Sequence, residues 1–142
     1  IEIEEYYLEH PDQDGSFPEL RPVVLGIMID RDDRRKRITE RLNYRLQHGM
    51  IEEVRQLLKS GINPEKLIFY GLEYKYLSLY ITGKISYDEM YVQLNTAIHQ
   101  FAKRQMTWFK KMEKEGIKIH WIDGNLELGE MVRKAVEVVD SG

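Results

Sequence analysis

The seven residues Val23–Ile29 place the strongest constraint on how this chain can fold. They form a continuous apolar run, VVLGIMI, that is rich in β-branched side chains. Such a run is typical of a strand that is covered on both faces in a parallel sheet. A strand of this kind needs neighbours, and the sequence offers one other short strand, where Ile117, Ile119 and Trp121 alternate with polar residues. Because two strands make a poor sheet, we expect an α/β protein whose remaining strands lie outside this sequence.

Helical patterns account for most of the other residues, so the chain is expected to be mostly helical with about two short strands. Apolar spacing predicts helices over 33–48 and 50–59. Asn63-Pro64 predicts the start of a helix that runs to Thr82. A capping box at 86–89 opens a long helix to about Glu115. After a turn at 123–125, a last amphipathic helix is expected to face inward with Leu128, Met131, Val132, Ala135, Val136 and Val139.

Composition excludes several classes of function. The formal net charge is −3, so any site for phosphate groups must be local. The absence of cysteine excludes disulfides, thiolate catalysis and cysteine-ligated zinc. The four histidines lack ligand spacing, so no metal site is expected on them. No apolar run approaches the length of a membrane span and no signal peptide is visible, which predicts a cytoplasmic protein without membrane contact.

The first candidate site is a series of arginines, Arg34, Arg37, Arg41 and Arg45. Steps of three and four residues put them along one side of a helix, at the border of its apolar stripe. Guanidinium groups in that position can offer several fixed donors to a phosphate or diphosphate. The alternative is a solvated charged face that pairs with Asp32, Asp33 and Glu40. The spacing alone does not separate the two interpretations.

Two further segments carry candidate binding residues. Residues 102–111 interleave basic side chains with Trp108 and Phe109, which suits RNA because cations meet phosphates while aromatic rings stack on bases. The alternative is an amphipathic helix with a core tryptophan, in which Gln105 falls inside the apolar stripe. Residues 69–76 combine four aromatic residues with one glycine and one lysine, and suit either a nucleotide pocket or a helix interface. The sequence contains no G-x-x-x-x-G-K-[ST] loop, no H-E-x-x-H and no Ser/His/Asp constellation.

Several motifs occur in a suggestive order. They are Arg37-Ile38-x-x-Arg41, Gly49-Met50-Ile51-Glu52-Glu53-Val54, Tyr80-x-x-Gly83-x-Ile85-Ser86, Ala102-Lys103-Arg104-Gln105-x-Thr107-Trp108-Phe109 and His120-Trp121-Ile122-Asp123. Together they resemble the C-terminal half of tRNA dimethylallyltransferases, over nearly the whole chain from Val23. The opening Ile1-Glu2-Ile3 resembles the tail of an arginine-rich helix of that family.

The resemblance implies a P-loop α/β core in which 1–142 is the C-terminal portion, with a helix remnant and loop over 1–22 and strand, helices, strand and helix over 23–142. It implies an enzyme that transfers a dimethylallyl group from dimethylallyl diphosphate to N6 of the adenosine 3′ of the anticodon (position 37). Mg²⁺ and the P-loop hold the diphosphate, and an aspartate acts as base. Both belong to the N-terminal half of the family's sequence, so this chain alone is expected to be inactive. The family is usually monomeric, but self-association of the isolated chain would cover its open sheet edge.

The resemblance also assigns roles to residues. Arg41 matches an arginine that contacts the diphosphate, and Arg37 belongs to the same motif. Two segments match tRNA contacts, comprising Tyr70, Gly71, Leu72, Glu73, Tyr74, Lys75, Lys103, Arg104, Gln105, Met106, Thr107, Trp108, Phe109 and Lys110. This sequence departs from the family at Glu73 and Tyr76, which replace a glycine and a glutamate, and at Ile98-His99, where an arginine is lost. These departures leave the exact tRNA substrate open.

Two other functions remain in competition with this one. The chain could be a stand-alone helical module that binds RNA or a protein without catalysis. It could also belong to a related P-loop enzyme that prenylates a free adenine nucleotide, although the segments that match tRNA contacts disfavour that reading.

Overall fold

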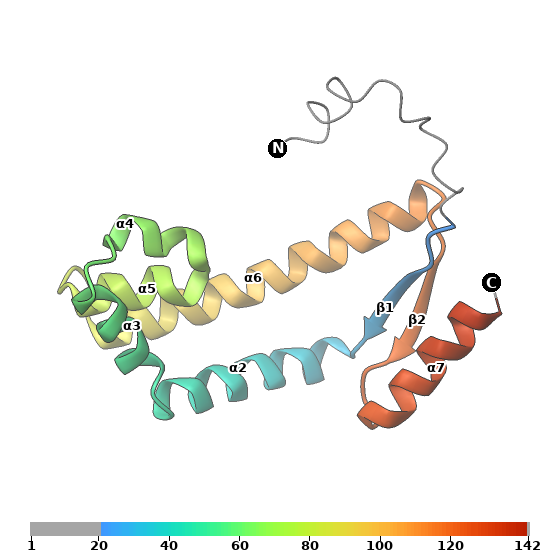
Figure 1. The fold of residues 1–142 in the computed structure, drawn as a ribbon, viewed down its shortest axis with the longest axis horizontal. Helices are drawn as coiled ribbons and strands as arrows, with labels where there is room; N and C mark the ends of the chain where they lie inside the picture. Colours follow the sequence, from blue (N-terminus) through green and yellow to red (C-terminus); the bar gives the residue numbers. More distant parts are fainter. Residues whose placement is uncertain (1–20, 142) are drawn as a thin grey trace, which may run out of the picture.

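The computed structural model describes residues 21–141 (Figure 1). Its elements are β1 (Val24–Met28), α2 (Arg31–Gln47), α3 (Met50–Lys59), α4 (Pro64–Leu67), the 3₁₀ helix η1 (Ile68–Tyr70), α5 (Leu72–Ile81), α6 (Tyr87–Lys114), β2 (Ile119–Asp123) and α7 (Leu128–Asp140). A mostly helical α/β fold with two parallel strands is therefore confirmed. The helix remnant and loop expected over 1–22 lie, as far as residue 20, outside the described residues.

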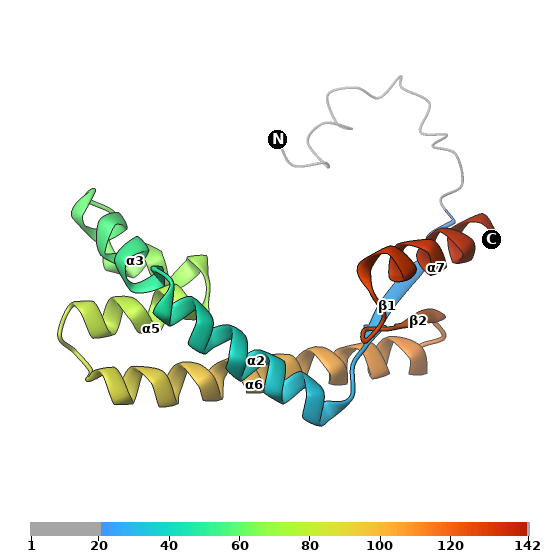
Figure 2. The ribbon, with the colours of Figure 1, turned by 90° about the horizontal axis from the view of Figure 1, so that it is seen from below.

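The two strands pair in parallel, with Val24 opposite Ile119 and Met28 opposite Asp123. The end of α6 and the whole of α7 lie on opposite sides of this pair (Figures 1 and 2). Gly26 lies against the ring of Trp121, and an added Cβ would come within 2.6 Å of that ring. A glycine in the middle of β1 thus leaves room for the aromatic ring to approach the strand closely.

The cover expected on both faces of β1 is not found within residues 21–141. Ile27 is 61% exposed, and β2 is the single strand neighbour of β1 in that range. The apolar face of α7 is also largely open, because α7 packs on β2 and no described layer lies beyond it. The prediction that Leu128, Val132, Val136 and Val139 face inward is therefore wrong for the described structure, and Met131 and Ala135 are half-buried.

The buried core lies at the other end of the molecule, in a helical lobe. It comprises Leu42, Leu46, Met50, Val54, Leu67, Leu77, Met90 and Leu94. The expected capping box is confirmed at the start of α6. The Ser86 hydroxyl accepts a hydrogen bond from the Glu89 backbone N–H (3.1 Å), and the Glu89 carboxylate accepts one from the Ser86 N–H (2.8 Å).

The single helix predicted from Asn63 to Thr82 is wrong. Asn63 does cap a helix, since its side chain accepts a hydrogen bond from the Glu65 backbone N–H (3.0 Å). That helix ends after one turn, passes into η1 and stops at Gly71, which has φ 138° and ψ 171°. Such a φ is open to glycine and strained for other residues, so Gly71 divides the segment and α5 begins in a new direction.

The long helix α6 leaves the helical lobe halfway along its length (Figure 1). Its first half packs on α5 and buries Met90 and Leu94. The second half lacks that cover, so Phe101 and Trp108 are more than half exposed. The prediction of Gln105 inside a buried stripe is therefore wrong, because this residue is exposed. None of the described helices combines the length and apolarity needed to cross a bilayer.

Candidate functional site

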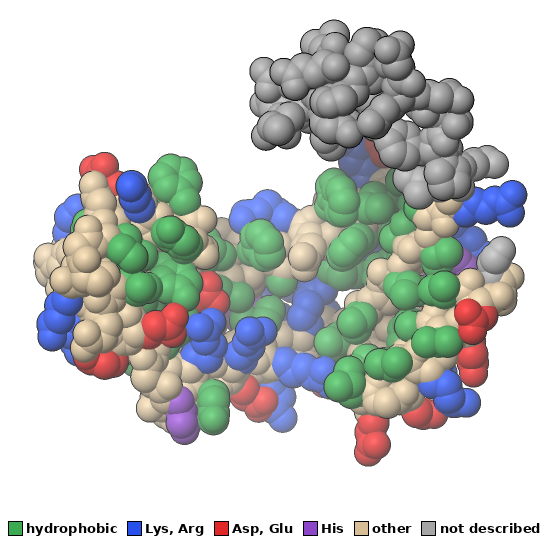
Figure 3. Space-filling view, in the orientation of Figure 1, with side chains coloured by type: hydrophobic (Ala, Val, Ile, Leu, Met, Phe, Trp, Pro, Cys, Tyr) green, Lys and Arg blue, Asp and Glu red, His purple; other side chains and the backbone are tan. Residues whose placement is uncertain are grey.

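A cleft of about 810 Å³ opens between the start of α2 and residues 95–110 of α6. The two helices meet in the helical lobe and separate toward the sheet (Figures 1 and 2), and Lys and Arg side chains gather around the opening (Figure 3). The cleft is lined by Met28, Ile29, Asp30, Arg31, Arg34, Arg35, Asn95, Thr96, His99, Gln100, Lys103, Met106 and Lys110. Its walls therefore carry five cations and one carboxylate.

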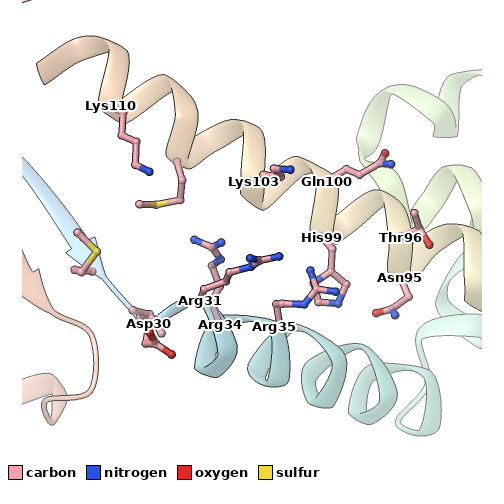
Figure 4. Close-up of a pocket in the computed structure, with 13 residues that line it drawn as sticks. Asp30, Arg31, Arg34, Arg35, Asn95, Thr96, His99, Gln100, Lys103 and Lys110 are labelled. Atoms are coloured by element: carbon pink, nitrogen blue, oxygen red, sulfur yellow. The ribbon is translucent and has the colours of Figure 1, made fainter. Parts of the chain in front are cut away.

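The helical repeat explains how these cations come together. Arg31, Arg34 and Arg35 share one face of α2, and Lys103 and Lys110 share one face of α6. In Figure 4 the three arginines extend toward α6, and Lys110 extends from α6 into the opening. None of the five forms an ion pair with any residue in the described range. The carboxylate of Asp30 instead caps α2 by accepting a hydrogen bond from the Asp32 backbone N–H (3.2 Å).

His99 lies in the same cleft, on α6. Its Nε2 is 3.2 Å from the Thr39 hydroxyl of α2, which joins the two walls. Partial burial lowers the pKa of His99 below its usual value, and the positive charges of Arg35 and Arg34 lower it further. The lowered pKa thus reflects the burial of the ring first and the positive charges on α2 second.

Arg41 occupies a separate, smaller hollow of about 150 Å³ at the middle of α2. Arg45, Glu73 and Ile98 also line this hollow, so α2, α5 and α6 converge there. Arg45 lies 3.5 Å from the Glu73 carboxylate. Arg41 is exposed and forms no ion pair with a described residue. Its guanidinium therefore keeps its donors available at the edge of the hollow.

Arg37 is engaged elsewhere. Its guanidinium donates hydrogen bonds to the Asn125 side-chain oxygen (2.7 Å) and to the Gly124 carbonyl (3.3 Å). These bonds hold α2 against the turn that follows β2. Among the described residues, none of the arginines in the series forms an ion pair with Asp32, Asp33 or Glu40. Glu40 instead lies 3.8 Å from Lys36.

The segment 70–75 contains exposed and half-buried residues. Tyr70 is 66% exposed beside Phe69, which is 90% exposed. Gly71, Leu72, Glu73, Tyr74 and Lys75 are half-buried. The Tyr74 hydroxyl donates a hydrogen bond to the Glu53 carboxylate (2.8 Å), which raises the pKa of Tyr74. Tyr70 is thus the aromatic side chain of this segment that is presented to solvent.

The segment 103–110 divides between different faces of α6. Lys103, Met106 and Lys110 line the cleft, whereas Arg104, Gln105 and Trp108 are exposed and do not line it. The Thr107 hydroxyl donates to the Lys103 carbonyl (3.1 Å). The rings of Phe109 and Trp121 are nearly perpendicular, with their centroids 5.9 Å apart. The Trp121 indole N–H donates a hydrogen bond to the Glu113 carboxylate (3.0 Å). Phe109 therefore fastens α6 to the sheet.

Comparison with known families agrees with the motifs. Residues 2–112 match the model of the IPP transferase family. The chain belongs to this family. A "tRNA dimethylallyltransferase 2" of Bacteroides fragilis is 58% identical over 132 residues, which is 93% of this chain and 43% of that relative. A second relative of the same name, from Porphyromonas gingivalis, is 52% identical and is matched over 97% of this chain and 46% of its own length.

Solved structures of IPP transferase relatives have the same fold. A tRNA isopentenylpyrophosphate transferase from Staphylococcus epidermidis superposes with a TM-score of 0.73 at 28% identity, over 97% of this chain and 46% of that one. A full-length enzyme from Bacillus halodurans gives a TM-score of 0.70 at 23% identity, over 84% of this chain and 38% of its own, and bears on the fold alone. The chain thus spans less than half the length of these relatives, and it matches their C-terminal part.

Within this IPP transferase chain, the structure brings together part of what the sequence predicts. Arg41 and Glu73 both line the small hollow. Lys103 and Lys110 line the large cleft together with the arginines of α2. Sequence reasoning missed Arg31, Arg35 and His99. The spacing of Arg31, Arg34 and Arg35 at i, i+3 and i+4 was a usable signal for one face of a helix.

Proposed function

We propose that this chain forms part of a tRNA dimethylallyltransferase, which transfers the dimethylallyl group of dimethylallyl diphosphate to N6 of the adenosine 3′ of the anticodon. Family membership supports the reaction class. The single observation in the structure that carries the proposal is the cleft between α2 and α6, where five cations face one carboxylate in a chain of net charge −3. A polyanionic substrate such as the tRNA anticodon stem-loop matches that local charge.

Arg41 is proposed to act on the diphosphate. In the transfer, the adenine amine forms a bond to the allylic carbon, the C–O bond to the diphosphate breaks, and the amine loses a proton to a base. Negative charge builds on the departing diphosphate, so a guanidinium held beside it favours the transition state. The exposed Arg41, without an ion-pair partner among residues 21–141, is available for that contact. Arg37 supports it by anchoring α2 to the turn at Gly124.

Mg²⁺ belongs to the proposed enzyme, but the described residues do not suit it. This ion takes oxygen ligands, usually carboxylates, and no group of three or more His, Cys, Asp or Glu residues in the described range could hold a metal. The P-loop and the base are likewise assigned to the part of the enzyme outside this chain, so residues 1–142 alone are expected to be inactive. A cytoplasmic location goes with a tRNA substrate.

The substitution Arg41→Ala in the full-length enzyme tests the proposal. We expect kcat to fall by about 10²–10³, the usual effect of removing one donor to developing charge. The Kd for tRNA, measured by filter binding, should change by less than about twofold. Lys36→Ala, a cation on the same helix paired with Glu40, serves as the matched control. Unchanged turnover in Arg41→Ala would remove Arg41 from the reaction, and tRNA binding by a full-length protein without any prenyl transfer would favour a non-catalytic module.

A further inference from the structure

We propose that the cleft between α2 and α6 binds RNA backbone phosphates on both walls, with Arg34 and Arg35 as phosphate ligands opposite Lys103. This inference rests on the proposed function and adds to it. The segments that match tRNA contacts supply the α6 wall alone, whereas the structure gives the site a second wall on α2.

The charge balance of the cleft supports a polyanion. A chain with a formal net charge of −3 collects five cations around one opening, and the one carboxylate there is bound to the backbone at the start of α2. Elsewhere on these two helices Lys36, Arg45 and Lys111 lie near Glu40, Glu73 and Glu115, whereas Arg41 and Arg104 have no ion-pair partner within residues 21–141. The cations of the cleft have none within residues 21–141. Gathering like charges without partners is unfavourable for the free protein, and a bound phosphate backbone offsets that repulsion.

The form of the cleft favours RNA over a small anion. Cations line both walls, while Met28, Ile29 and Met106 supply apolar surface between them. Spaced cations with apolar surface suit a strand in which phosphates alternate with bases. Arg41 does not line this cleft, so the diphosphate contact proposed for Arg41 uses a different hollow.

His99 reports on occupancy of the cleft. It faces Arg34, Arg35 and Thr39 from α2, and its own helix presents Asn95 and Lys103 nearby. A phosphate bound to Arg34 and Arg35 counters their positive potential at the imidazole, so the pKa of His99 rises when RNA binds. RNA binding through this cleft is therefore linked to proton uptake, and it strengthens as the pH falls toward the usual pKa of histidine.

The test measures the salt dependence of RNA binding by the full-length enzyme. The probe is a synthetic anticodon stem-loop, with Kd determined by fluorescence anisotropy over a series of salt concentrations. In the double variant Arg34→Ala/Arg35→Ala, the slope of log K against log[salt] should fall in magnitude by about 1.4, at about 0.7 for each lost contact to single-stranded RNA. Lys36→Ala lies on the opposite face of the same helix and should keep the wild-type slope.

Two additions keep the result interpretable. Arg34→Lys/Arg35→Lys retains both charges and should restore most of the slope, which loss of folding would not allow. NMR titration of His99 should show a higher pKa with the stem-loop bound than without it. A wild-type slope in the double alanine variant overturns the proposal, and so does a pKa of His99 that RNA leaves unchanged.

The double alanine variant also distinguishes the RNA backbone from dimethylallyl diphosphate as the source of the phosphate groups in the cleft. If the cleft binds the RNA backbone, the double alanine variant weakens RNA binding and leaves the KM for dimethylallyl diphosphate unchanged. A raised KM with unchanged RNA affinity assigns the cleft to the diphosphate and overturns the inference. A loss of salt slope in an enzyme that shows no transfer under any condition would instead refute the proposed function and leave the cleft proposal standing.

Discussion

At the scale of single residues, exposure separates side chains that are available to a ligand from those that hold the fold. Within the two segments that are predicted to contact tRNA, Phe109 contacts Trp121 and Tyr74 is hydrogen-bonded to Glu53. Tyr70 and Trp108 are more than half exposed. Each segment thus contains both side chains that are exposed and side chains that are held in contacts, so a tRNA contact has to be argued residue by residue.

Tyr70 provides a test at this scale. In the full-length protein, Tyr70→Ala should weaken binding of the anticodon stem-loop by about 1–3 kcal/mol if the ring stacks on a base. Tyr70→Phe keeps the ring and should bind nearly as well as wild type. Because the side chain is 66% exposed, the thermal unfolding temperature should hardly move in either variant. Equal weakening in Tyr70→Phe and Tyr70→Ala would argue for a hydroxyl contact and against stacking.

At the scale of elements, local signals predicted most of the helices and both strands. The capping box of α6, the Asn63 cap and the apolar run of β1 all depend on neighbours in sequence, so the sequence alone reveals them. The division of 63–82 at Gly71 was not predicted, because the sequence does not show whether a glycine within a helical pattern adopts a helical or a positive φ. The sequence predicted some of the cleft residues, namely Arg34, Lys103 and Lys110, but not that the two helices bring them together. Helical spacing identifies a basic face, but the contact of Thr39 with His99 depends on packing between two helices at residues that lie 60 positions apart in the sequence.

The capping box gives a prediction for α6. Ser86→Ala removes the acceptor for the Glu89 backbone N–H, and should lower the free energy of unfolding by about 1 kcal/mol. Ser86→Asp keeps an acceptor at the same position and should retain most of that stability. Chemical denaturation of the two variants side by side measures the difference. A Ser86→Ala protein as stable as the aspartate variant would show that tertiary packing alone sets the start of α6.

At the scale of the whole molecule, burial is uneven between the two ends. The helical lobe holds the fully buried side chains, including Leu77, Met90 and Leu94. The sheet end exposes Ile27 on β1 and the apolar side of α7 within the described residues. A self-contained core therefore exists at one end, whereas the other end presents apolar surface of the kind that proteins usually cover.

This difference predicts unequal sensitivity to truncation of apolar side chains. In the isolated 142-residue chain, Met90→Ala should cost about 2–5 kcal/mol, as expected for a side chain that is fully buried. Val132→Ala should cost less than about 1 kcal/mol there, because that side chain is 53% exposed. Urea unfolding of both variants gives the comparison. A large cost for Val132→Ala in the isolated chain would indicate that α7 is covered in solution, for instance by self-association.

The opening between α2 and α6 is held at both of its ends by covalent or packed structure. The two helices meet in the helical lobe through Leu42, Leu46 and Leu94, and at the far end they run into two strands that are hydrogen-bonded to each other. This closed frame sets the distance between the cationic walls before any ligand arrives. Little conformational freedom is then lost on association, so the frame itself contributes to affinity without touching the ligand.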